Sequence, residues 1–183
     1  MEIKKVLVPV DFSENSKKIL EVAGYFSGKW QAEVHAVFVV QSFDDYSGFF
    51  VPHMPVAKFE EEMVQAAEEK MESFLAGHKN IAAKVLVGDV AEEIIRHAEE
   101  SGMDLIIMGT HGYKGLEKVM FGSVAEKVVR SSPCPVLTIN PYKNLYGEMD
   151  FPYENLSVQK SQYAGCRPLP TADKWLEVEK PLE

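Results

Sequence analysis

The strongest signal in this chain comes from residues 105–129, LIIMGTHGYKGLEKVMFGSVAEKVV. The opening apolar run predicts a buried strand, and the apolar spacing at the other end predicts a helix. Between them lie Gly109, Gly112 and Gly122, the last followed by Ser123. Glycines let a backbone approach an anion closely, and the start of a helix attracts negative charge. The pattern indicates a phosphate-binding loop, although a tight turn that needs glycine for shape alone has the same spacing.

Composition limits the class of protein. The chain has 183 residues, enough for one domain with a real core. Its net charge of -9 argues against a nucleic-acid partner, since such partners need basic clusters, yet one nucleotide could still bind locally. Cys134 and Cys166 make neither a disulfide framework nor a metal site. The start lacks a signal-peptide pattern and no apolar run is long enough for a membrane, so we expect a soluble, cytoplasmic protein with no membrane partner.

Short apolar runs alternate with amphipathic segments along the first part of the chain. Strands are predicted at 3–9, 34–40, 81–87, 103–108 and 135–139, and helices start near Ser13, Lys58, Asp89 and Gly122, with Gly28, Gly77 and Gly102 closing the first three. This alternation predicts an α/β fold with right-handed crossovers and a mostly parallel sheet. Such sheets bind ligands beyond the carboxyl ends of their strands, where the strand order reverses. Asp11 and Gly109 follow the first and fourth strands, so both belong to that edge.

Residues 141–183 differ from the rest, with scattered prolines and no long periodic segment. We therefore divide the chain into a domain at 1–140 and an extended C-terminal arm at 141–183. The arm carries the aromatic residues Tyr142, Tyr146, Phe151, Tyr153, Tyr163 and Trp175. Disordered tails usually have few aromatics, so these rings are expected to dock on a folded surface; the alternative is a flexible tail.

Four motifs resemble those of a known family. They are VLVPVDFS at 6–13, DLIIMGTHG at 104–112, FGSVAEKVV at 121–129 and SPCPV at 132–136. Together they resemble the universal stress protein family over about residues 2–140, and the glycine spacing resembles its ATP-binding branch. The resemblance implies an open, Rossmann-like sheet of five parallel strands in the order 3-2-1-4-5. It also implies a homodimer in which the fifth strands, at 135–139, meet.

The resemblance assigns roles to eight residues. Asp11 lies against the adenosine end of the nucleotide, where its carboxylate accepts from ribose or adenine; alternatively it is only an acid at a helix start. The backbone of Val39 reads the adenine edge, and its side chain is also a plain core candidate. The phosphate and ribose candidates, acting mainly through backbone N–H groups, are Met108, Gly109, Gly112, Gly122, Ser123 and Val124. Tyr113 stands where the family often has a basic residue, which removes one charge contact to phosphate.

The function predicted from these features is that of an ATP-binding regulatory or stress-response module. ATP is the expected cofactor, with Mg²⁺ or Mn²⁺ held through its phosphates rather than by protein ligands. An ATP-hydrolysing or phosphoryl-transferring enzyme is the alternative, and a nucleotide-free dimerisation scaffold is a third. The P-loop and the dinucleotide-binding glycine motif are both absent, and no base or arginine cluster is placed for phosphoryl transfer. We interpret His111 as a packed loop residue and predict no catalytic residue.

Overall fold

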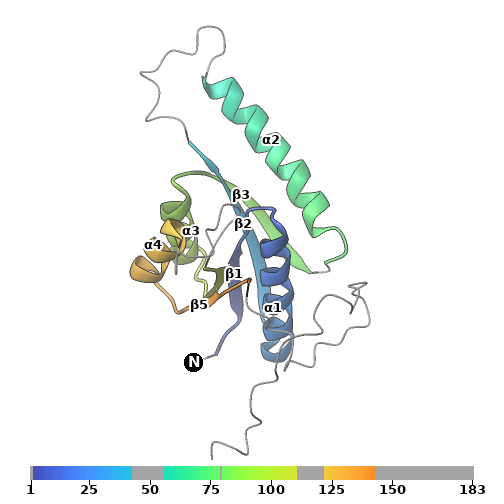
Figure 1. Ribbon diagram of the computed structural model, residues 1–183, viewed down its shortest axis with the longest axis vertical. Coiled ribbons are helices and arrows are strands. Elements are labelled where there is room, and N and C mark those ends of the chain that lie inside the picture. The colour runs from blue at the N-terminus through green and yellow to red at the C-terminus, as the bar shows by residue number, and fades with distance from the viewer. Residues whose placement is uncertain (1, 43–55, 79, 111–121, 143–183) are drawn as a thin grey trace, which may run out of the picture. The chain divides into compact units, whose positions relative to one another are not determined.

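A computed structural model describes residues 2–42, 56–78, 80–110 and 122–142 (Figure 1). In chain order the elements are β1 (Lys5–Pro9), α1 (Glu14–Trp30), β2 (Glu33–Gln41), α2 (Val56–Leu75), β3 (Ile81–Gly88), α3 (Val90–Glu100), β4 (Leu105–Gly109), α4 (Ser123–Ser131) and β5 (Val136–Ile139). All strand pairs are parallel, and the order is β3-β2-β1-β4-β5. The predicted α/β fold and strand order are confirmed.

The helices cover both faces of the sheet (Figure 1). α1 and α2 contact one face, and α3 and α4, which also contact each other, cover the opposite face. Side chains alternate along a strand, so each central strand supplies both layers of core. The largest fully buried side chains are Leu7, Leu20, Ile94, Ile106, Ile107, Val6, Val8, Val22, Val37 and Val128. The strands deepest in the sheet therefore consist of continuous apolar residues, as in other parallel sheets.

Two helix starts are capped as the sequence predicts. Ser13 caps α1, where its hydroxyl accepts a hydrogen bond from the Ser16 N–H at 3.2 Å. Asp89 caps α3, where its carboxylate accepts from the Glu92 N–H at 3.0 Å. That bond, followed by the contact with the Lys127 ammonium, lowers the pKa of Asp89 below its ordinary value. Each cap satisfies a backbone donor that the helix itself leaves unpaired.

The predicted end of α1 at Gly28 is wrong. The helix continues to Trp30, and Gln31 takes the left-handed cap with φ 55°. Phe26 and Trp30 lie one turn apart and stack with ring centroids 5.1 Å apart, which favours the extra turn. The strand predicted at 3–9 is also shorter and starts at Lys5. Helix ends move by a turn when contacts of this kind outweigh the preference for glycine.

Several predicted features lie outside the described residues. They are Gly112, His111 and Tyr113 of the glycine loop, and the arm from Lys143 onward. The arm and the roles given to these residues therefore stay predictions.

A buried histidine, His97, lies on the core side of α3 with 6 % of its surface exposed. Its Nδ1 lies 3.4 Å from the Ser101 hydroxyl. Burial, and then the positive charges of Lys84 and His35, lower the pKa of His97 below its ordinary value of 6.5. The sequence does not reveal this burial, because a histidine on an apolar helix face carries no signal of its depth.

His97 is expected to make stability fall in mild acid. The unfolded chain takes up the proton near pH 6.5 while the folded chain resists it, so the free energy of unfolding declines as pH falls below that value. Denaturant unfolding between pH 7.5 and about pH 5 should show a shallower decline in His97→Gln than in the wild type. Parallel curves for the two proteins would contradict this assignment.

Candidate functional site

The candidate site lies at the carboxyl ends of β1 and β4, which are neighbours in the sheet. From β1 the chain crosses to β2 on one side, and from β3 it returns to β4 on the other side. The strand order therefore reverses between β1 and β4, which is the usual place for a ligand in an open parallel sheet. Asp11 follows β1, Gly109 ends β4, and Ser123 begins α4.

Asp11 organises the first turn of α1. Its Oδ1 accepts hydrogen bonds from the Ser13 N–H at 3.0 Å and from the Ser13 and Ser16 hydroxyls, each at 2.5 Å. The Asp11 N–H in turn donates to the Ser16 hydroxyl at 2.9 Å. The carboxylate is thus held in one place at the edge of the sheet, as a binding residue requires. The simpler interpretation, an acid at a helix start, also holds.

Val39 presents its backbone beyond the end of β1. The Glu33 N–H donates to Lys4 O at 2.7 Å, and Val37 O accepts from the Val10 N–H at 2.9 Å, so alternate residues of β2 turn their peptide groups toward β1. The pairing of β1 with β2 ends at Pro9 and Val37. Val39 lies two residues after Val37, so its N–H and C=O also face the β1 side of the strand. They lie past Pro9, the last residue of β1 that is paired with β2. Its side chain is 8 % exposed and belongs to the core, so it can serve both roles.

Gly122 joins the start of α4 to the end of β4. Its N–H donates to Thr110 O at 2.8 Å, and the Thr110 N–H donates to Ile139 O at 2.8 Å. Gly122 has φ -73° and ψ 154°, which any residue adopts. Among the described residues, an added Cβ would meet only Thr110 O, at an ordinary 3.4 Å. Neither the backbone nor the described packing requires glycine here, which weighs against a glycine kept for turn shape alone.

The donors for an anion at this helix start are Ser123 and Val124. The Gly122 N–H is already bonded to Thr110, so Gly122 contributes space rather than the predicted donor. The first N–H groups of a helix have no partner within it, and α4 has no side-chain cap. Ser123 is exposed and adds a hydroxyl, and Val124 is half-buried. Both therefore fit a phosphate placed against the positive end of α4.

Met108 and Gly109 are the last two residues of β4, at the edge of the sheet where the candidate site lies. Met108 is 4 % exposed and is paired in register with Thr138, and Gly109 is paired with Ile139. Their backbones belong to the sheet ladder, so they shape the edge of the sheet. Seven of the eight predicted site residues lie in the described residues, at the carboxyl ends of β1, β2 and β4 or at the start of α4; the eighth, Gly112, does not.

The first turn of α4 contains an acidic residue, Glu126, whose charge opposes anion binding. Its carboxylate pairs with Arg130 Nη2 at 2.6 Å, and both side chains are largely exposed. The cation partly neutralises the charge and the pair is screened by water, so the repulsion of a bound anion is small.

Comparison with known proteins shows the family of the chain. Residues 2–140 match the family model of the universal stress protein family. This chain belongs to the universal stress protein family. It is 34% identical over 148 residues to universal stress protein MJ0531 of Methanocaldococcus jannaschii, covering 76% of this chain and 84% of that protein.

Solved structures share the fold of this universal stress protein. The structure of M. jannaschii MJ0577 is similar with a TM-score of 0.65 at 30% identity, over 79% of this chain and 99% of that one. A universal stress protein of Archaeoglobus fulgidus, solved in complex with dAMP, has a TM-score of 0.53 at 20% identity, covering 76% of this chain and 100% of that one. The second likeness is one of fold.

Two further residues of the candidate site, Ser16 and Thr110, were not predicted from the sequence. The Ser16 hydroxyl holds Asp11 by donating to its carboxylate and accepting from its backbone N–H. Thr110 is 7 % exposed and links β4 to β5 and α4. The signal for Ser16 was present, because an acid followed by serines two and five residues later at a helix start favours such bonds. Thr110 had no signal, since the two bonds by which it links β4 to β5 and α4 are made by its backbone.

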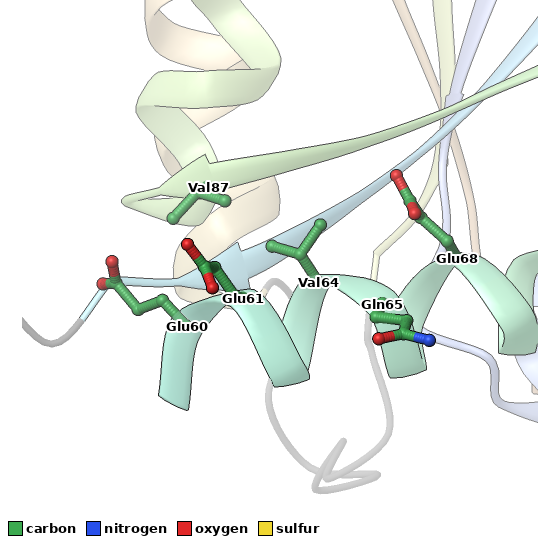
Figure 2. A pocket seen from close by; sticks show the side chains of 6 residues that line it. All are labelled: Glu60, Glu61, Val64, Gln65, Glu68 and Val87. Carbon is green, nitrogen blue, oxygen red and sulfur yellow. The ribbon is translucent and has the colours of Figure 1, made fainter. Parts of the chain in front are cut away.

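A separate hollow of about 440 Å³ lies between α2 and β3. It is lined by Glu60, Glu61, Val64, Gln65, Glu68 and Val87, and Figure 2 shows Glu61 and Val64 on α2 below Val87 of β3. None of the predicted site residues lines it. Its carboxylates repel a nucleotide's phosphates, so this hollow is not a candidate nucleotide site.

Within the described residues, no group of three or more His, Cys, Asp or Glu side chains could hold a metal ion. The helices in the described part of the chain include none long and apolar enough to cross a membrane.

Proposed function

We propose that this universal stress protein binds ATP at the carboxyl ends of β1 and β4 and acts in the cytoplasm as a stress-response module. The observation that carries the proposal is that the described fold does not require a glycine at position 122. A glycine that the described fold does not need is accounted for by a ligand that passes close to the backbone. Ser123 and Val124 next to it offer that ligand helix-start N–H groups that have no partner within α4.

Each site residue has a role in this proposal. The N–H and C=O of Val39 bind the adenine edge, and Asp11 accepts from the ribose or adenine. Ser123 and Val124 bind the phosphates, and the backbone of Met108, Gly109 and Gly112 lines the space between. Mg²⁺ or Mn²⁺ accompanies the phosphates, since such ions prefer substrate phosphates to protein cages. Three or four charge-assisted bonds of about 1.5–3 kcal/mol, against an association cost of about 4–15 kcal/mol, are compatible with a Kd on the order of micromolar.

Calorimetric titration with ATP and GTP tests the proposal. Guanine presents a donor and an acceptor in the opposite sense along the edge that Val39 would read, so the N–H of Val39 would face a donor and its C=O would face an acceptor. We expect ATP to bind at least about tenfold more tightly than GTP, because an unpaired buried group costs about 1–3 kcal/mol. Equal affinities, or no binding of ATP, would contradict the proposed role of Val39 or the proposal as a whole.

We also propose that the protein is a homodimer through β5. This strand is at one end of the sheet, paired only with β4 among the described strands. Its residues are apolar apart from Thr138, and an open apolar edge is an aggregation hazard unless another strand or segment covers it. A second copy of β5 would satisfy this edge, and the resemblance to the family supports that partner.

A further inference from the structure

Phe12, which follows Asp11, has an unusual backbone. Its φ is 62°, in the left-handed region that favours glycine. A bulky side chain rarely adopts this conformation, because its Cβ crowds the backbone there. Such a residue persists only where its surroundings hold it, and these outliers gather at functional sites. Contacts with other residues must therefore hold Phe12 in this conformation.

The Phe12 ring is held from two elements. It stacks on Phe38 of β2 with ring centroids 4.3 Å apart and an interplanar angle of 27°. It meets Phe74 of α2 edge-on at 5.4 Å and 72°, and Lys70 Nζ lies 5.1 Å from its ring centroid. Aromatic pairs and cation–π contacts of this geometry are favourable beyond simple burial. Together they stabilise a turn that the backbone alone would avoid.

The turn at Phe12 determines where Asp11 lies. The chain leaves β1 at Pro9, and α1 begins at Glu14, so only a few residues change its direction. The turn brings the Ser13 N–H and the Ser13 and Ser16 hydroxyls onto Asp11 Oδ1. Without the ring contacts, other backbone conformations at Phe12 become accessible, and the carboxylate loses its fixed position.

The stack of Phe12 on Phe38 also adjoins Val39, the other residue proposed to contact adenosine. Phe38 directly precedes Val39 in β2, and successive side chains of a strand point to opposite faces. The Phe38 ring packs on Phe12, while Val39 belongs to the core under α3 and α4. The contact between the two rings thus joins the Asp11–Phe12 segment to the Phe38–Val39 segment.

We propose that Phe12 is a positioning residue for the adenosine end of the nucleotide: its ring, packed on Phe38 and Phe74, fixes the left-handed turn that holds Asp11 in place beside Val39. This inference rests on the proposed function. Phe12 itself does not touch the ligand and acts through Asp11. The consequence is that the contribution of Phe12 to ATP affinity disappears when the Asp11 carboxylate is removed.

A double-mutant cycle with ATP calorimetry tests this. Asp11→Ala and Phe12→Ala should each weaken ATP binding by about tenfold, and the double variant should bind no more weakly than Asp11→Ala alone. Phe26→Ala, which removes an aromatic stack at the far end of α1, is the matched control and should bind ATP like the wild type. If Phe12→Ala does not fold, Phe38→Leu removes the same stack and should show the same coupling to Asp11.

The possible results separate the two claims. Losses that add in the double variant, to about a hundredfold, would overturn the positioning role, because Phe12 would then act independently of Asp11. Unchanged affinity in Phe12→Ala would overturn it as well. A wild type that does not bind ATP would overturn the proposed function, and this inference with it.

Discussion

Gly122→Val is expected to weaken ATP binding by about a hundredfold or more while the protein stays folded. The valine side chain would occupy the space between Thr110 and the start of α4, where the phosphates are proposed to lie. It would displace at least two charge-assisted bonds of about 1.5–3 kcal/mol each. The fold should tolerate the change, because the φ of -73° suits any residue and a Cβ meets Thr110 O at 3.4 Å.

Two matched variants make the Gly122 experiment specific. Gly122→Ala should give an intermediate loss, since its methyl group is smaller. Gly24→Val changes an exposed glycine of α1 whose added Cβ has nothing described within 4 Å, and it should bind ATP like the wild type. Equal calorimetric titrations for the wild type and Gly122→Val would show that the ligand does not approach Gly122.

Thr138→Pro is expected to convert the proposed dimer to a monomer. Pro135 O accepts from the Ile106 N–H at 3.0 Å, and Ile139 O accepts from the Thr110 N–H at 2.8 Å. Alternate residues of β5 therefore face β4, and the Thr138 N–H points away from it. Proline at this position leaves the β4 pairing intact and removes a donor that a second β5 strand would need.

Light scattering coupled to size-exclusion chromatography measures the effect. The wild type should show twice the chain mass of 20.5 kDa at micromolar concentration, and Thr138→Pro should show the single-chain mass. Thr138→Val keeps the N–H and should stay dimeric. A monomeric wild type, or a dimeric and folded Thr138→Pro, would contradict an interface through β5.

Local signals in the sequence were sufficient for the framework of the fold. The serine and aspartate caps at Ser13 and Asp89 depend on bonds within one helical turn, so their residue types predict them. The parallel sheet follows from the alternation of apolar runs and amphipathic segments. The order 3-2-1-4-5 came from the resemblance to the family, because alternation alone does not fix which strands are neighbours.

Features that depend on contacts between distant residues were not predictable. The depth of His97 depends on the sheet beneath α3. The left-handed turn at Phe12 depends on rings from β2 and α2, which are far away in sequence. At the site, the backbone of Val39 lies beyond the β1 pairing only because that pairing ends at Pro9. The Gly122 N–H is not available to a ligand because it donates to Thr110 O.

The location of the nucleotide is tested most directly by amide chemical shifts recorded during an ATP titration of the full chain. We expect the largest shifts at Val39, Ser123 and Val124, and small shifts at Val64 and Val87 in the acidic hollow between α2 and β3. Saturation at ATP concentrations on the order of micromolar should accompany them. Shifts concentrated around Val64 and Val87, with Ser123 and Val124 unmoved, would contradict a nucleotide site at the ends of β1 and β4.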